Sequence, residues 1–186
     1  SRKRSGASVL TGLEVLTREK PRWLRGRKVG LLMHPASVAA DFTSARRILH
    51  ELCGARLRAL FGPQHGFAGE KQDNMVESAH GRDAQLGVPI FSLYSETRSP
   101  TPRMLEDIDL LLVDLQDLGC RVYTFVTTLA YVLEAAAQHH KEVWILERPN
   151  PAGRPVEGSL LEPGWESFVG AGPLPMRHGM TLGELA

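Results

Sequence analysis

Five short apolar runs organise the chain, and each is mostly continuous rather than alternating with polar residues. They are rich in Val, Leu and Ile, and they cover residues 28–33, 56–61, 88–94, 108–115 and 142–146. Continuous apolar runs of this length are typical of strands that are buried on both faces. The pattern therefore predicts at least five parallel strands in an open sheet.

Helical patterns separate these runs. Asp41 or Thr43 is expected to cap the first of them, and Pro102 suits the first turn of the second. The predicted helices cover residues 44–52, 101–107 and 124–140, with a leading helix over 12–24. Strand and helix in alternation predict an α/β fold, a doubly wound parallel sheet with three α/β/α layers.

The composition and net charge argue against some classes of function, namely binding to nucleic acid or to a membrane. The chain has 186 residues, of which 42% are hydrophobic and 23% charged, and its net charge is +1. This is an ordinary globular composition, without the positive field that would favour nucleic acid or an anionic membrane. No apolar run reaches the roughly 18 residues that span a bilayer. We expect a flexible basic tail over residues 1–11 and a cytoplasmic protein. A secreted or periplasmic one stays open, because the chain begins at Ser1 and a leader could have been removed.

Cofactor motifs are absent from the sequence. The turn after the first strand, HPASV at 34–38, lacks the glycine fingerprint of dinucleotide sites, and no GKS or GKT phosphate loop occurs. No GxSxG elbow is present, which argues against serine hydrolases. Cys53 and Cys120 belong to no metal-type pair and are expected to be reduced, at a helix end and in a loop. We predict no cofactor.

The most polar stretch follows the second predicted strand, at 61–74 (FGPQHGFAGEKQDN). Gly62 and Pro63 end the strand, and polar side chains begin there. Ligands bind at the carboxyl ends of the strands in open parallel sheets. The alternative is a surface loop with solvated charges. The candidate site residues in this stretch are Gln64, His65, Glu70 and Asp73.

Two more polar loops follow the fourth and fifth predicted strands. The first contains Asp114, Asp117, Arg121 and Tyr123, and the second contains Asn150. Carboxylates that share one edge of a sheet can act as acid and base, while guanidinium and amide groups orient a polyhydroxylated ligand. A simpler interpretation is that the two aspartates cap backbone amides and that Arg121 pairs with one of them. A divalent metal on Asp114, Asp117 and His65 is conceivable, but no metal-ligand spacing supports it, and we predict no metal.

Residues 156–180 are dense in Gly and Pro and are predicted to form a long irregular excursion that covers a site. Glu157 begins it, and Arg177 and His178 end it. Trp165 and Phe168 could form a wall for a sugar face or anchor the excursion to the core; we favour anchoring.

The last residues form the start of a helix, with Thr181 as N-cap and Glu184 as its capping-box partner. One turn of helix is not stable alone. We therefore expect residues 12–186 to be the N-terminal domain of a longer protein, truncated before a smaller C-terminal domain. The apolar face left uncovered could support self-association.

Five motifs in this order resemble those of the exo-β-N-acetylmuramidase family of peptidoglycan glycosidases. They are FGPQHGFAGEKQDN, SLYSETRSPTPRML, DLQDLGCRVYTF, ERPNPAGRPVEG and PMRHGMTLGELA. The resemblance implies a bacterial hydrolase of cell wall recycling, with a Rossmann-like N-terminal domain that bears the active site. The implied activity releases N-acetylmuramic acid from the non-reducing end of peptidoglycan fragments or muropeptides.

The chain departs from the family at Gln64, where many members carry Glu, and an amide does not protonate a leaving oxygen. We therefore assign catalysis to Glu70, Asp117 and His65. The lactyl carboxylate of the sugar suits Arg121 or Arg177. The expected substrate-binding residues are Gln64, Asp73, Arg121, Tyr123, Asn150, Glu157, Arg177 and His178. Two other functions stay open, a non-catalytic protein that binds sugar or cell-wall fragments and a metal-dependent phosphoesterase.

Overall fold

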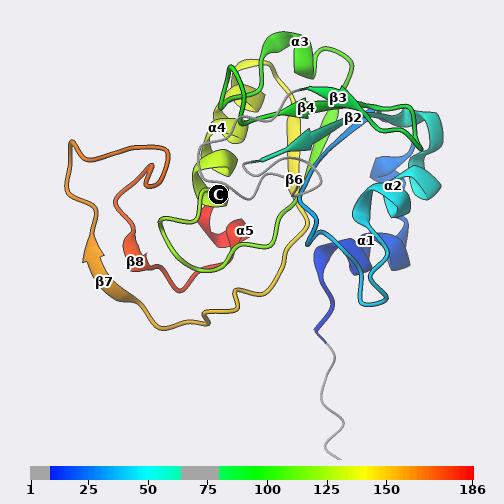
Figure 1. Ribbon diagram of the computed structural model, residues 1–186. Helices are drawn as coiled ribbons and strands as arrows, with labels where there is room; N and C mark the ends of the chain where they lie inside the picture. Colours follow the sequence, from blue (N-terminus) through cyan, green and yellow to red (C-terminus); the bar gives the residue numbers. More distant parts are fainter. Residues whose placement is uncertain (1–8, 64–79) are drawn as a thin grey trace, which may run out of the picture.

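The computed structural model describes residues 9–63 and 80–186, and the structural statements below refer to these residues. Its main element is a six-stranded sheet in the order β3-β4-β2-β1-β5-β6 (Figure 1). Every neighbouring pair is parallel except β3 with β4. The strands are β1 (Val29–Met33), β2 (Leu57–Gly62), β3 (Gly81–Arg82), β4 (Pro89–Ser92), β5 (Leu110–Asp114) and β6 (Glu142–Ile145). All five predicted strands are confirmed, whereas the short antiparallel edge strand β3 was not predicted.

The strands β1 and β5 lie side by side at the centre of the sheet, and every residue in both is buried. Their carboxyl ends meet where Met33 pairs with Asp114. From β1 the chain builds outward through β2 and β4 on one side, and through β5 and β6 on the other. The strand order therefore reverses between β1 and β5, and in doubly wound sheets ligands bind at such a switch point.

Helices cover both faces of the sheet, so the predicted three layers are confirmed. Leu13 and Leu16 of α1 (Gly12–Glu19) pack with Leu49 of α2 (Ala45–Cys53) on one face. On the other face Leu105 of α3 (Pro102–Leu105) and Leu129 of α4 (Phe125–Gln138) share a second core (Figure 1). Among the described residues, no helix has the length and apolar character needed to cross a membrane.

Two helix starts and one helix end test the expected boundaries. The leading helix is shorter than predicted, because Lys20 takes a left-handed conformation with φ 44° and Pro21 follows. A short 3₁₀ turn, η1 (Arg22–Leu24), replaces the last part. Capping of α2 by Asp41 or Thr43 is wrong: Ser44 is the N-cap, without a side-chain bond, and Asp41 accepts instead from the Thr43 amide at 2.9 Å. Pro102 begins α3 as expected.

The region predicted to be an irregular excursion contains a second, two-stranded antiparallel sheet, so that prediction was wrong in part. It consists of β7 (Glu157–Leu160) and β8 (Pro175–Arg177), and we call residues 157–177 the arm. Figure 1 shows the arm beside the three layers, leading into α5 (Leu182–Leu185). The predicted capping box of Thr181 and Glu184 is confirmed.

Candidate functional site

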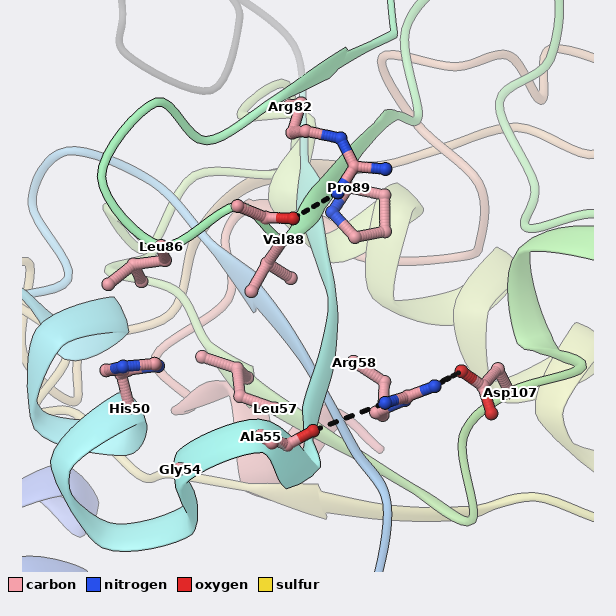
Figure 2. Close-up of a pocket in the computed structure, with 11 residues that line it drawn as sticks. His50, Gly54, Ala55, Leu57, Arg58, Arg82, Leu86, Val88, Pro89 and Asp107 are labelled. Carbon is pink, nitrogen blue, oxygen red and sulfur yellow. Dashed lines mark hydrogen bonds and ion pairs between the residues drawn. The ribbon is translucent and has the colours of Figure 1, made fainter.

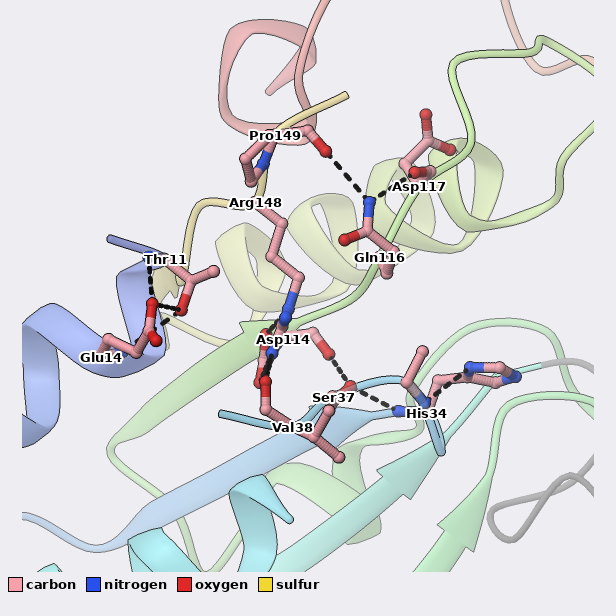
Figure 3. A network of polar contacts seen from close by, with 11 residues as sticks. Thr11, Glu14, His34, Ser37, Val38, Asp114, Gln116, Asp117, Arg148 and Pro149 are labelled. Atoms are coloured by element: carbon pink, nitrogen blue, oxygen red, sulfur yellow. Dashed lines mark hydrogen bonds and ion pairs between the residues drawn. The ribbon is translucent and has the colours of Figure 1, made fainter. Parts of the chain in front are cut away.

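Three loops meet at the carboxyl edge of the sheet, beside the switch point (Figure 3). In the loop after β1, the Ser37 hydroxyl accepts from the His34 amide at 2.9 Å and donates to the Asp114 carbonyl at the end of β5. In the loop after β5, the Gln116 amide donates to the Asp117 carbonyl at 2.8 Å and to the Pro149 carbonyl, beyond β6, at 3.1 Å. The edge is therefore a continuous hydrogen-bonded structure that fixes these loops relative to one another.

Asp114 is held by Arg148 in a buried ion pair. The Arg148 Nε and Nη2 atoms donate to the two carboxylate oxygens at 2.5 and 3.0 Å, and Nη2 also donates to the Val38 carbonyl at 3.0 Å. Burial raises the pKa of Asp114, while the Arg148 hydrogen bonds and charge oppose the shift. The alternative in which Arg121 pairs with Asp114 is therefore wrong, since Arg148 donates to both oxygens of Asp114. Asp114 is thus a poor metal ligand and a structural group.

Asp117, three residues later, has a different environment. Its Oδ2 atom accepts from the Gly119 amide at 2.7 Å and lies 3.3 Å from His178 Nε2, while its Oδ1 atom is buried and has no hydrogen-bond partner among the described residues. Asp117 is 4% exposed and His178 1%. Because the Met180 amide donates to His178 Nδ1 at 3.3 Å, a neutral ring carries its proton on Nε2, facing the carboxylate. Asp117 and His178 thus form a buried dyad.

The dyad has the properties of an acid or base. Burial raises the pKa of Asp117, and the Gly119 amide and His178 oppose the shift. A carboxyl group that holds its proton at higher pH than usual is suited to general acid and base work. Burial, and after it the charge of Asp117, raises the pKa of Tyr123, whose phenol therefore stays protonated as a donor. An unpartnered buried carboxylate oxygen is costly without a ligand, so we regard Asp117 as the centre of the site.

His34 and Tyr123 both pack against the Phe125 ring. Their ring centroids are 5.1 and 4.6 Å from that of Phe125. The three aromatic rings thus bring the end of β1 and the start of α4 together at the switch point.

Asn150 ties the loop after β6 to the segment that carries His178. Its amide nitrogen donates to the Met180 carbonyl at 2.8 Å, and its oxygen accepts from the Ala152 amide at 2.8 Å. A Cβ atom on Gly119 would lie 2.3 Å from that oxygen. The polar atoms of Asn150 are therefore engaged within the chain, and only glycine fits opposite them.

Of the two arginines expected to bind a carboxylate, Arg121 contacts the arm and Arg177 is the last residue of the arm. Arg121 is 9% exposed, and its Nη1 atom donates to the Ser159 and Leu174 carbonyls at 2.9 and 2.5 Å. It pairs with no carboxylate of the described residues, so the simpler interpretation in which Arg121 pairs with an aspartate is wrong. Arg177 pairs with Glu157 at 2.8 Å and donates to a backbone carbonyl.

Phe168 anchors the arm, as favoured from the sequence. Its ring lies 5.4 Å from the ring of Tyr94 and 6.2 Å from that of Tyr131. Trp165 is 74% exposed and does not serve as an anchor.

Some predicted residues are not placed, and others were missed. Gln64, His65, Glu70 and Asp73 lie outside the described residues. Sequence reasoning did not single out His34 or Arg148 as site residues. The signal that could have found them is position, because each lies in a loop that follows a predicted strand. Arg148 in particular lies two residues after an apolar run, and a charge that enters a core needs an opposite charge.

A hollow at the opposite edge of the sheet offers no comparable chemistry. It has a volume of about 350 Å³, and Figure 2 shows Arg58 and Arg82 on either side of it with His50 on α2. Arg58 already donates to Asp107 at 2.7 Å, and Arg82 donates to the Gly87 carbonyl. Within residues 9–63 and 80–186, no group of three or more His, Cys, Asp or Glu side chains could hold a metal ion.

The sequence is similar to a described family and to a curated relative. Residues 29–186 match the family model described as "Exo-beta-N-acetylmuramidase NamZ, N-terminal". The chain is 44% identical over 179 residues to the peptidoglycan beta-N-acetylmuramidase NamZ of Bacillus subtilis (strain 168), and the match covers 96% of this chain and 43% of that protein.

The fold is similar to two crystal structures of DUF1343 family proteins from Bacteroides fragilis NCTC 9343. One has a TM-score of 0.86 at 42% identity, over 95% of this chain and 44% of the other. The second has a TM-score of 0.80 at 33% identity, over 96% of this chain and 46% of the other. The chain thus spans less than half the length of these relatives.

Proposed function

The chain belongs to the family of exo-β-N-acetylmuramidase N-terminal domains, and from this premise we propose that it is the site-bearing part of a peptidoglycan glycosidase. The proposed reaction releases N-acetylmuramic acid from the non-reducing end of peptidoglycan fragments. The observation that carries the proposal is the Asp117 carboxyl group, which is buried at the switch point with a raised pKa and one oxygen without a partner among the described residues. The 44% identity to a protein named as such an enzyme supports it.

Hydrolysis of a glycosidic bond by the common route needs two carboxyl groups, one on each side of the bond. We propose Asp117 as one of them, with His178 holding its orientation. Glu70 is the proposed second group, assisted by His65 and with Gln64 and Asp73 on the sugar. The stretch that carries these residues begins at the carboxyl end of β2, next to β1.

The remaining assignments follow from what each side chain already contacts. Tyr123 is a protonated donor near Asp117, and we propose that it binds a sugar oxygen. Asn150 and Glu157 bond within the chain, so we assign them to shaping the site. Of the two guanidinium groups considered for the lactyl carboxylate, that of Arg177 is the more exposed, with 33% of its side chain accessible, and it is the better candidate.

The test uses the full-length protein that contains this domain, with a chromogenic N-acetylmuraminide and with glycan fragments whose products are identified by mass spectrometry. Loss of general acid or base catalysis typically lowers turnover about 10²- to 10⁴-fold, so we expect losses in this range for Glu70→Gln and Asp117→Asn. Unchanged activity in both variants would contradict the assignment. Binding of the sugar by calorimetry without product would favour the non-catalytic alternative, and inhibition by a chelator would favour a metal-dependent phosphoesterase.

The proposal for Gln64 has its own test. If Glu70 supplies the acid, Gln64→Glu adds a second negative charge near the first and should leave activity unchanged or lower. A rise of more than about 100-fold, the lower bound for general acid catalysis, would instead assign the acid to position 64.

We also propose that residues 12–186 form the catalytic domain of a longer cytoplasmic protein, in which a smaller domain follows. The relatives support a longer protein, since each is more than twice as long as its match, but in each of them the rest of the protein is longer than the matched part. Cell fractionation with an antibody against the domain tests the compartment. Gel filtration of the domain alone and of the full-length protein tests self-association. We expect the domain alone to self-associate, through the face that the following domain would cover, and the full-length protein not to.

A further inference from the structure

We propose that Arg121 is a positioning residue that sets the arm, and through the arm places His178 against Asp117. The inference rests on the proposed function for its kinetic consequences but not for its structural ones. It assigns Arg121 a role different from that of a receptor for the substrate carboxylate.

The first observation is the position of the Arg121 guanidinium group between the two strands of the arm. Its Nη1 atom donates to the Ser159 carbonyl at 2.9 Å, in β7, and to the Leu174 carbonyl at 2.5 Å, directly before β8. Hydrogen bonds from a charged donor are stronger than neutral ones. One nearly buried side chain therefore connects both strands of the arm to the loop after β5.

The second observation is that the backbone around Arg121 runs along β8. The Arg121 amide donates to the Met176 carbonyl at 2.9 Å, and Cys120 forms an isolated bridge with Arg177. The His178 amide then donates to the Gly119 carbonyl at 3.4 Å. Residues 119–121 are thus joined to β8 and to His178 by backbone hydrogen bonds and one antiparallel bridge.

This arrangement fixes both members of the dyad from one place. Asp117 Oδ2 accepts from the Gly119 amide at 2.7 Å, and His178 is the first residue after β8. A shift of β8 along residues 119–121 would move His178 relative to Asp117. Catalytic groups tolerate displacements of this kind poorly, because a misplacement of about 1 Å can lower turnover 100-fold.

The stem of Arg121 contributes packing as well. A Cβ atom on Gly170 would lie 3.8 Å from Arg121 Cδ and 3.3 Å from Leu161 Cδ2, so the far part of the arm also rests on this side chain. With 9% of its surface exposed and no carboxylate partner among the described residues, Arg121 is directed toward carbonyls of its own chain rather than toward solvent.

Hydrogen exchange of full-length Arg121→Met, followed by mass spectrometry, tests the structural part. Loss of hydrogen bonds to a charged donor should accelerate exchange in residues 157–177 by about tenfold or more, while β1 and β5 stay protected. Arg22→Met is the control, because Arg22 is exposed on η1 and its side chain has no hydrogen-bond or ion-pair partner within residues 9–63 and 80–186. Unchanged protection of the arm in Arg121→Met would overturn the proposal. Should that variant unfold the whole domain, Arg121→Lys should show the same acceleration to a smaller degree, and its absence would count equally against the proposal.

Kinetics separate a positioning role from a receptor role. We expect Arg121→Met to lower kcat at least about tenfold with KM changed less than about twofold, since catalytic geometry rather than uniform binding is lost. Preferential inhibition by free N-acetylmuramic acid over N-acetylglucosamine, which lacks the lactyl group, should be retained. A raised KM together with loss of that preference would identify Arg121 as the carboxylate receptor and overturn the proposal. If the wild-type protein has no turnover, the proposed function fails. The hydrogen exchange experiment then still tests whether Arg121 holds the arm in place.

Discussion

Asp114 and Asp117 stand three residues apart at the carboxyl edge of one sheet, and their environments differ. Asp114 is fully buried, and both of its oxygens accept from Arg148. Asp117 is almost as buried, but one of its oxygens has no partner among the described residues, and its neighbour is a histidine. Burial raises the pKa of both carboxyl groups.

Burial and a raised pKa do not by themselves identify a functional carboxylate. What separates the two groups is hydrogen-bonding capacity that is left over. A carboxylate whose acceptors are all satisfied holds a structure together, whereas one with a vacant acceptor can receive a donor from a ligand. Substitutions around Asp114 should therefore lower the stability of the fold, whereas substitutions around Asp117 should lower turnover.

The largest effect on stability is expected from Arg148→Met. Removal of one member of a buried ion pair leaves an uncompensated charge, which typically costs about 3–5 kcal/mol. Urea unfolding followed by circular dichroism measures the change in the free energy of unfolding. Arg154→Met is the control, since Arg154 pairs with Glu184 on the exposed surface and should give no measurable change.

The same urea unfolding experiment should include the double variant Asp114→Leu with Arg148→Met. Replacement of both members of a buried pair by apolar groups is often neutral. We expect the double variant to be more stable than Arg148→Met alone. A double variant that is less stable would show that Asp114 contributes through bonds other than its pair with Arg148.

A smaller loss of stability is expected from Gly119→Ala. Gly119 has φ 78°, and a Cβ atom there would lie 2.3 Å from Asn150 Oδ1. Gly26 is the matched control: its φ is 79°, but none of the described residues has an atom within 4 Å of a Cβ atom placed there. Gly26→Ala should cost only the left-handed backbone term of about 1–2 kcal/mol. Gly119→Ala should cost more than this and should also lower activity, because it separates Asn150 from the loop of Asp117; equal costs in both variants would contradict the close contact.

A more modest effect concerns pH. Because the folded protein raises the pKa of Asp117 above the ordinary value of 3.8, the folded state binds more protons than the unfolded state between the two values. Stability from this group is therefore highest at low pH and falls as the pH rises from about 4 through the folded pKa. Asp117→Asn removes the titration, so the stability difference between wild type and variant should change over that interval and be constant above it. A difference that does not vary with pH would contradict the raised pKa.

The smallest effect is expected from Glu157→Gln. Glu157 pairs with Arg177, but 65% of its side chain is exposed, and surface pairs contribute less than about 1 kcal/mol. We expect almost unchanged unfolding and turnover. A large loss of turnover with unchanged stability would instead indicate that Glu157 contacts the substrate.

Much of the fold could be predicted from the sequence, because buried parallel strands leave continuous apolar runs. The run over 108–115, for example, became β5 with every residue buried. The antiparallel β3 has two exposed residues and leaves no such pattern. The strand β7 is exposed along its whole length, so its pairing with β8 depends on distant partners such as Arg121 rather than on local hydrophobicity.

The location of the candidate site could be predicted from the sequence, but the contacts between its side chains could not. The order of strands and loops brought Asp117, Tyr123 and Asn150 to one edge, as polar residues behind parallel strands predict. Partner choice was not predictable, since Asp114 is 34 residues from Arg148 and Asp117 is 61 from His178. Only the folded chain decides which guanidinium or imidazole reaches each carboxylate.

The most direct test of the central claim is the comparison of Asp117→Asn with Asp114→Asn in the full-length protein, with turnover of a chromogenic N-acetylmuraminide and the urea midpoint measured on the same samples. Asp117→Asn should lose about 10²- to 10⁴-fold in turnover while its midpoint stays at or above that of the wild type. Asp114→Asn should lower the midpoint, because Arg148 is left buried without its counter-charge. Full turnover in Asp117→Asn, or loss of folding in that variant alone, would contradict the assignment of Asp117 as the functional carboxylate and Asp114 as the structural one.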